Sequence, residues 1–265
     1  DFKRSVRLVL VPTTCGTGSE VTEIAAINRT RLGCKAGIAG PEMFADDAVL
    51  VPELLYGLPD HVFATSSLDA LVHSVESTLS PNSTPYTRMF GYEAMKMIIS
   101  GYKAVAEAGP AGSPERRVKR NELMRDFLIA SDYAGISFDT GGCAAVHALS
   151  YQLGGKYHVP HGESNYAMFT GVLRNYMEIK PEGEILKMNQ FIADILGCDV
   201  ADVYDALETL INKLLPKKAL HEYGVTEQDL PEFADRVIKT QERLMKNCFV
   251  PLDYDRVLKI FKELY

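Results

Sequence analysis

The chain has 265 residues, of which 46% are hydrophobic and 24% charged, and its formal net charge at pH 7 is −7. The apolar fraction and the modest charge exclude intrinsic disorder, and the acidic balance argues against a nucleic-acid partner, which would select a basic face. No apolar run approaches the ~20 residues that a membrane span needs, so we expect no membrane partner.

The part of the chain before Pro59 consists of short apolar and β-branched segments separated by Gly, Asn and Asp. Such segments are typical of strands. The predicted strands cover residues 6–11, 23–28, 35–39 and 48–51. This pattern indicates the end of a sheet-containing domain.

Directly after the first predicted strand, residues 12–20 combine two glycines with several hydroxyl side chains. Backbone N–H groups in such a loop can face an anion such as a phosphate. The loop lacks the third glycine of GxGxxG and the GK[ST] ending of a P-loop. On these residues alone, an anion-binding loop and an ordinary glycine-rich turn both remain open.

From Pro59 onward, apolar residues recur at helical spacing, and Ser, Pro, Asn and Gly gather between the periodic segments. The predicted helices cover residues 59–79, 86–108, 114–136, 142–153, 163–177, 183–196, 200–215, 227–246 and 254–264. The expected fold class is therefore an α/β remnant over residues 1–58 followed by an all-α domain over residues 59–265.

Asp69, His73 and Glu76 follow one another at helical spacing on the flank of an apolar stripe in the predicted helix 59–79. Side chains four residues apart on a helix can converge on one ion. A carboxylate–imidazole pair on the helix surface is the simpler interpretation of Asp69 and His73 taken alone.

Two further histidines lie in segments whose backbone is constrained by small residues or by proline. His147 follows a run of small residues, where the backbone packs closely, and His161 lies in the turn Val159-Pro160-His161-Gly162 that opens a helix. Taken alone, each of them favours a structural role over a role as a ligand. Together with Asp69 and His73 they form a set of one carboxylate and three imidazoles, which suits Zn²⁺ or Fe²⁺.

The five cysteines are widely spaced and form no CxxC pair, which favours isolated thiols in a reducing compartment. The first residues lead into a strand-like run rather than a secretory segment. We therefore expect a cytoplasmic protein.

Three segments, in this order, resemble the iron-containing (group III) alcohol dehydrogenase family: PTTCGTGSEVT, SSLDALVHSVES and VHALSYQLGGKYHVPHGE. The likeness continues through residues 222–225 and the C-terminal residues 251–265. The resemblance implies an NAD(H)-linked, metal-dependent alcohol dehydrogenase with a small-molecule alcohol or aldehyde substrate. The implied reaction interconverts 4-hydroxybutyrate and succinic semialdehyde.

The resemblance also implies roles for individual residues. One ion, Fe²⁺ or Zn²⁺, would be held by Asp69, His73, His147 and His161. The cofactor NAD would be contacted at its phosphates and nicotinamide end by the loop residues Thr13, Thr14, Gly16, Thr17, Gly18 and Ser19. The helical part would be the catalytic, metal-binding domain.

One position departs from the family pattern. Many members carry another histidine four residues after the third ligand, where this chain has Tyr151. We expect Tyr151 to hydrogen-bond cofactor or substrate. From charge and position, Lys156 and His158 are our candidates for holding a substrate carboxylate, which completes the predicted catalytic set.

A second departure concerns the nucleotide-binding half, because the family's GGGS turn does not occur in this chain. We expect residues 1–58 to be the C-terminal part of an α/β dinucleotide-binding domain, with on the order of a hundred residues of it missing. Such a chain would form the metal site but bind NAD poorly and be nearly inactive alone. Apolar helices left uncovered would favour a homo-oligomer.

Two other classes of function remain open at this stage. A helical metal-dependent hydrolase could use the same ligands to activate water, although it would not need the loop at residues 13–20. A non-catalytic helical interaction domain would bind no stoichiometric metal.

Overall fold

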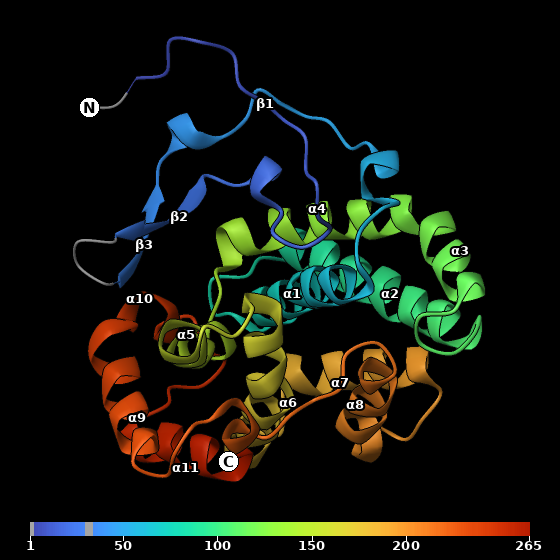
Figure 1. The fold of residues 1–265 in the computed structure, drawn as a ribbon. Coiled ribbons are helices and arrows are strands. Elements are labelled where there is room, and N and C mark those ends of the chain that lie inside the picture. Colours follow the sequence, from blue (N-terminus) through green and yellow to red (C-terminus); the bar gives the residue numbers. More distant parts are fainter. Residues whose placement is uncertain (1–2, 30–33) are drawn as a thin grey trace.

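The computed structural model describes residues 3–29 and 34–265, which form a helical body with a strand-containing segment along one side (Figure 1). The helices are α1 (Asp60–Leu79), α2 (Pro85–Glu107), α3 (Pro114–Glu122), α4 (Met124–Gly141), α5 (Ala145–Tyr157), α6 (His161–Ile179), α7 (Glu184–Leu196), α8 (Val203–Asn212), α9 (Asp229–Thr240), α10 (Glu242–Met245) and α11 (Tyr254–Leu264). The all-α architecture predicted after Pro59 is confirmed.

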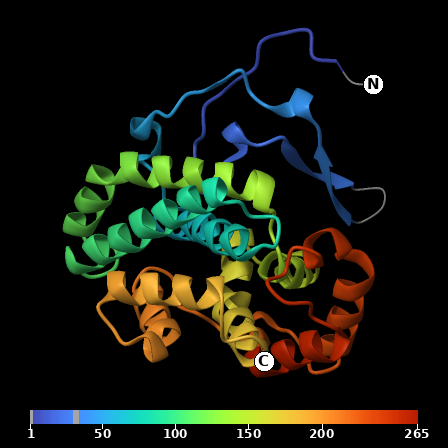
Figure 2. The same cartoon turned by 180° about the vertical axis from the view of Figure 1, so that it is seen from behind.

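The N-terminal segment contains the strands of the described residues in two separate pairs. β1 (Val9–Leu10) pairs in parallel with β4 (Asp47–Ala48), and β2 (Ile24–Arg29) pairs antiparallel with β3 (Cys34–Ala39). Both views place this segment over α4, on the side of the helices away from the C-terminus (Figure 2). The predicted strand 6–11 was too long, because only Val9 and Leu10 find a partner, and the predicted strand 48–51 overlaps β4 only at Ala48.

Several helix boundaries differ from the prediction for local backbone reasons. The predicted helix 114–136 divides into α3 and α4 at Leu123, whose φ of −92° and ψ of 0° interrupt the helix. The start predicted at Gly142 moves to Ala145, because Gly142 has a φ of 75°, which a right-handed helix cannot continue. Gln241 likewise separates α9 from α10.

Helix α1 runs through the centre of the domain and packs against α2, α4 and α6. Its side chains are buried continuously from Ser67 to Leu79, polar ones included. Such burial is costly for any polar group that lacks an internal partner. Asp69 and His73 are only 5% and 6% exposed, so the simpler interpretation of a surface pair is wrong.

Close approach of α6 to α1 depends on a glycine. A Cβ on Gly162 would lie 1.9 Å from the carbonyl oxygen of Thr65, so only glycine fits where the two helices cross. This contact sets the first turn of α6 against α1. Along the described ranges 3–29 and 34–265, no helix has the length and apolar character needed to cross a membrane.

Candidate metal centre

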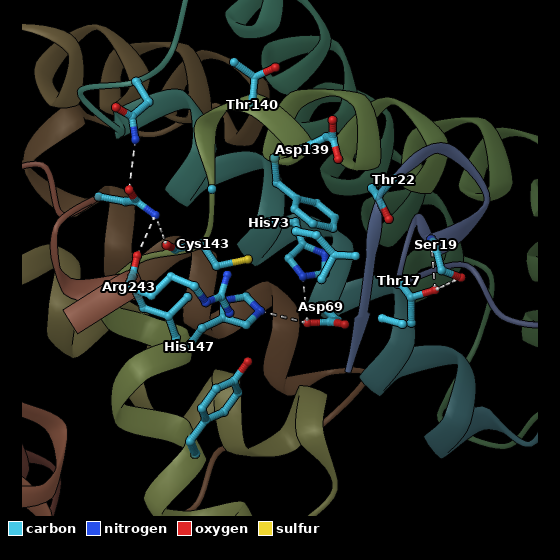
Figure 3. Close-up of a pocket in the computed structure, with 18 of the residues that line it drawn as sticks. Thr17, Ser19, Thr22, Asp69, His73, Asp139, Thr140, Cys143, His147 and Arg243 are labelled. Atoms are coloured by element: carbon cyan, nitrogen blue, oxygen red, sulfur yellow. Dashed lines mark hydrogen bonds and ion pairs between the residues drawn. The ribbon is translucent and has the colours of Figure 1, made fainter. Parts of the chain in front are cut away.

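Three helices bring the predicted ligands to one place. Asp69 and His73 lie one turn apart on α1, His147 lies in the first turn of α5, and His161 is the first residue of α6. Figure 3 shows Asp69, His73 and His147 pointing toward one another on one side of a cavity. The structure therefore brings together side chains from three distant stretches of the sequence.

The distances within this cluster suit a single ion. The Asp69 Oδ1 atom lies 3.4 Å from His147 Nε2, 3.5 Å from His161 Nε2 and 3.7 Å from His73 Nε2. Bonds of 2.0–2.1 Å place the ligand atoms of a tetrahedral ion roughly 3.4 Å apart. The donor atoms of Asp69, His147 and His161 all lie within 4.8 Å of one another, which fits a divalent transition metal. His73 Nε2 approaches the same carboxylate oxygen from the side of Cys143.

The second ring nitrogen of two of these histidines is held by the protein. His147 Nδ1 lies 2.6 Å from Glu76 Oε2, and His73 Nδ1 lies 3.2 Å from the carbonyl oxygen of Gly16. Such contacts fix the ring orientation and direct Nε2 inward. Glu76 and the Gly16 carbonyl are therefore the acceptors, whereas the Ser150 hydroxyl donates a hydrogen bond to the backbone carbonyl of His147.

Glu76 also anchors the start of α5. Its carboxylate accepts hydrogen bonds from the backbone N–H groups of Ala144 at 2.9 Å and Val146 at 2.5 Å. A carboxylate at a helix N-terminus satisfies free N–H groups and complements the helix dipole. One buried side chain therefore positions both the helix that carries His147 and the ring itself.

Electrostatics keep the central carboxyl ionised. Burial penalises the charge on Asp69, but His73, His161 and His147 outweigh this effect and hold the pKa of the Asp69 carboxyl below its usual range. Burial also disfavours charge on His73, yet the Asp69 carboxylate raises the pKa of His73. A raised pKa favours the protonated ring while no ion is bound, so a cation that uses the ring nitrogen as a ligand would displace that proton.

Two residues of this cluster were missed in the sequence. The Asn165 amide donates a hydrogen bond of 2.8 Å to Asp69 Oδ1 from a fully buried position one turn after His161. Cys143 lies with ring nitrogens of His73 and His147 in a second group of donor atoms, all within 4.8 Å of one another. Burial raises the pKa of the Cys143 thiol, but His147 and His73 lower it to about 7. A buried polar residue at helical spacing from a ligand was the available signal for Asn165.

The cluster opens into a cavity of about 580 Å³. Its wall includes Thr17 and Ser19 of the glycine-rich loop, Asp139 at the end of α4, and Arg243 and Lys246 around α10. All four predicted metal ligands and Tyr151 also line it. The cavity thus places polar groups of the N-terminal segment opposite those of α10.

The two glycines of the loop have a packing role. A Cβ on Gly16 would lie 2.4 Å from the carbonyl oxygen of Ser66 on α1, and one on Gly18, whose φ is 56°, would lie 2.6 Å from the Cα of Gly135 on α4. The loop can therefore press against both helices only with glycine at these positions. This packing brings Thr17 and Ser19 to the cavity, while Thr13 and Thr14 are not among its lining residues.

The predicted catalytic residues do not all line one cavity. The Tyr151 ring lies 6.0 Å from the His161 ring, on the wall of the cavity. Lys156 is paired with Asp229 and lines a neighbouring cavity of about 710 Å³ instead. His158 ends α5 in a left-handed conformation and lines neither cavity. The structure does not bring Lys156 and His158 to the wall of the 580 Å³ cavity, although Tyr151 and His161 also line the cavity beside Lys156.

Two family models match the chain. The one described as "Fe-containing alcohol dehydrogenase family, C-terminal" covers residues 63–265, and the one described as "Iron-containing alcohol dehydrogenase" covers residues 1–52. The 4-hydroxybutyrate dehydrogenase of Clostridium kluyveri is 47% identical over 262 residues, which are 99% of this chain and 69% of that protein. The sulfoacetaldehyde reductase of Bilophila wadsworthia is 33% identical, over 97% of this chain and 66% of the reductase.

Solved structures agree with the sequence matches. A 1,3-propanediol oxidoreductase superposes with a TM-score of 0.83 at 25% identity, over 98% of this chain and 66% of the other. A sulfoacetaldehyde reductase from Bifidobacterium kashiwanohense in complex with NAD⁺ superposes with a TM-score of 0.82 at 25% identity, over 98% and 65%. The chain thus spans about two thirds of the length of these proteins.

Proposed function

The chain belongs to the iron-containing alcohol dehydrogenase family, and from that membership we propose that the protein interconverts 4-hydroxybutyrate and succinic semialdehyde with NAD(H) and a divalent metal ion. The observation that carries the proposal is the convergence of Asp69 Oδ1 with the Nε2 atoms of three histidines at 3.4–3.7 Å. The 47% identity to a 4-hydroxybutyrate dehydrogenase supports the choice of substrate.

In this proposal Asp69, His73, His147 and His161 hold the ion, Fe²⁺ or Zn²⁺. A divalent ion at this position supplies a Lewis acid that polarises a carbonyl and favours the ionised form of an alcohol. The chain's own groups orient the ligands, because Glu76 and the Gly16 carbonyl hold two imidazole rings. The Asn165 amide steadies the Asp69 carboxylate.

The cofactor site is proposed at the loop of residues 13–19. Thr17 and Ser19 line the same cavity as the histidines, which supports a nicotinamide ring in the cavity and phosphates at the loop. The similarity to a reductase in complex with NAD⁺ supports this placement. Tyr151, on the cavity wall beside His161, is assigned a hydrogen bond to cofactor or substrate.

Two measurements, made on a form that includes a complete nucleotide-binding portion, test the proposal. Elemental analysis should find about one Fe or Zn per chain, and NADH should be oxidised when succinic semialdehyde is added. Removal of the metal by a chelator should abolish the oxidation, and re-addition of the metal should restore it. Hydrolysis of phosphodiesters or esters without NADH turnover would instead support a metal-dependent hydrolase, and a protein without metal would support an interaction domain.

Two further expectations are part of the proposal. A cytoplasmic location is supported by unpaired cysteines among the described residues, including Cys15, Cys143, Cys198 and Cys248. A homo-oligomer stays an expectation, supported only by the exposed apolar side chains of one N-terminal segment, Val6, Val9 and Val11. Light scattering of the purified protein tests the second expectation.

A further inference from the structure

Arg243 lies on the cavity wall that faces the glycine-rich loop. It is the second residue of the short helix α10, and its side chain lines the same cavity as the four predicted metal ligands. Figure 3 shows Arg243 beside Cys143 and His147, with Thr17 and Ser19 on the far side of the histidine cluster. A cation in this place is separated from the loop proposed to hold the cofactor's phosphates.

The charge of Arg243 is not neutralised by a carboxylate in the part of the chain that the structure describes. Other cations nearby are neutralised, because Lys156 pairs with Asp229 and Arg236 pairs with Glu232 at 2.6 Å. The two acids of the cavity are also engaged, Asp69 with the histidines and Asp139 with the backbone N–H of Glu23 at 3.1 Å. Lys246, one turn after Arg243, adds a second positive charge to the same wall.

The helix that carries Arg243 is held in place from both sides. The Asn247 amide donates a hydrogen bond of 2.9 Å to the carbonyl oxygen of Cys143, and its own oxygen accepts one of 2.9 Å from Asn82. Leu244, adjacent to Arg243, is buried in the core. A cation on such an anchored element loses little freedom when it binds a ligand.

The positive charge on this wall of the cavity favours binding of a carboxylate. A guanidinium presents a planar pair of N–H donors that matches a carboxylate, and it keeps its charge at every relevant pH. The histidine cluster on the adjoining wall would take the alcohol or aldehyde end of a substrate. The two features together select a short chain with an acid at the end away from the reacting carbon.

We propose that Arg243 binds the carboxylate of the substrate and selects short ω-hydroxy acids and ω-oxo acids over neutral alcohols and aldehydes. This inference rests on the proposed function, and it replaces Lys156 and His158, which lie outside the cavity, as the group that holds the acid. The comparisons are consistent with it, because 4-hydroxybutyrate and sulfoacetaldehyde, named for two relatives, both carry an anionic group.

The test compares succinic semialdehyde with butanal, which has the same chain length and no carboxylate, in the intact metal-loaded protein with NADH. Arg243→Met should lower kcat/KM for succinic semialdehyde ~10- to 100-fold, mainly through KM, as expected for the loss of a charge-assisted hydrogen bond. The value for butanal should change less than about twofold, and Arg243→Lys should be intermediate. Calorimetric binding of 4-hydroxybutyrate should weaken by the same factor.

Arg236→Met is the matched control, since this arginine lies on α9 with its charge already paired, and it should keep the wild-type preference. An equal loss on both aldehydes in the Arg243→Met variant would assign Arg243 a structural role and overturn the proposal. An unchanged preference in that variant would also overturn it while leaving the proposed function intact. A wild-type protein with no preference for succinic semialdehyde would refute the proposed substrate and the role of Arg243 together.

Discussion

At the scale of single residues, Glu76 connects most of the candidate metal centre. Its carboxylate accepts hydrogen bonds from the backbone at the start of α5 and contacts the ring of His147, while it lies on the same helix as Asp69 and His73. A ligand held in this way has lost its rotational freedom before the ion arrives. The affinity for metal should therefore depend on a residue that does not touch the metal.

We expect Glu76→Gln to lower the affinity for divalent metal ~10- to 100-fold, the usual size of such effects. Glutamine keeps one acceptor oxygen, but its NH₂ group would face the backbone N–H groups and the His147 ring nitrogen that contact the carboxylate. Competition with a chelator measures the affinity, and circular dichroism checks the fold. Glu93→Gln, at an exposed residue of α2 paired with Lys96, is the control and should leave affinity unchanged. A folded Glu76→Gln protein with wild-type affinity would contradict the assignment.

At the scale of elements, the crossing of α1 and α6 sets the position of His161. The absence of a side chain at Gly162 lets the first turn of α6 lie against Thr65, one turn before Asp69. His161 precedes this glycine directly, so its ring follows any movement of the crossing. Packed helices do not absorb an added atom without shifting.

Gly162→Ala should therefore destabilise the protein by about 1–3 kcal/mol and weaken metal binding as well. Gly155→Ala on α5 is the matched control, because a Cβ at that position meets nothing within 4 Å. The control should raise the free energy of unfolding by about 0.5–1 kcal/mol, through the better helix propensity of alanine. Urea unfolding of both variants measures the difference. If Gly162→Ala raised the free energy of unfolding as Gly155→Ala does, the two helices would not approach so closely.

Helices α5 and α9 are joined by a hydrogen-bonded carboxylate. Asp229 accepts hydrogen bonds from the Lys156 ammonium and from the Tyr157 hydroxyl, the latter at 2.6 Å. Lys156, and then Tyr157, hold the pKa of the Asp229 carboxyl below its usual range. A lowered pKa in the folded state means that the ionised carboxylate stabilises the fold above the unfolded-state pKa of about 3.9, and that this contribution is lost as the pH falls.

Asp229→Asn should reduce stability at about pH 7 by about 1–3 kcal/mol, since a hydrogen bond to a charged group is lost. The gap between variant and wild type should narrow as the pH falls below about 4, because the wild type then loses the same contribution. Urea unfolding at several pH values measures the gap. A gap that stays constant across this range would show that the charge of Asp229 does not stabilise the fold.

At the scale of the whole molecule, the helical part is extensive and the strand-containing part is small. Within the described ranges, the parallel pairing is confined to the two-residue strands β1 and β4. A dinucleotide normally binds across several parallel strands at the carboxyl edge of a larger sheet. The chain also spans about two thirds of the length of the solved relatives.

We therefore expect the 265-residue chain on its own to bind one divalent ion per molecule but to bind NAD(H) weakly and turn over slowly. Elemental analysis and a fluorescence titration with NADH measure the two properties separately. A longer form that includes a complete nucleotide-binding portion is the reference. Equal turnover by both forms would refute this expectation.

The sequence by itself determined the helical architecture and the residue types of the ligand set. Apolar periodicity predicted most helices to within a few residues, because it reflects which face each helix buries. The motifs around Asp69 and His147 carried the resemblance to the family, because donor atoms at fixed local spacing leave a pattern in the chain. These properties are local, so they can be recognised without knowing the fold.

The tertiary structure decided which remote groups meet. Asn165 beside Asp69 and Arg243 beside His147 left no local pattern, because each pair comes from different helices that only packing brings together. Lys156 has the charge that a substrate carboxylate would need, but α9 supplies Asp229 as its partner. Charge and spacing identify a side chain's chemistry, but the partner that uses or neutralises this chemistry depends on how the helices pack against one another.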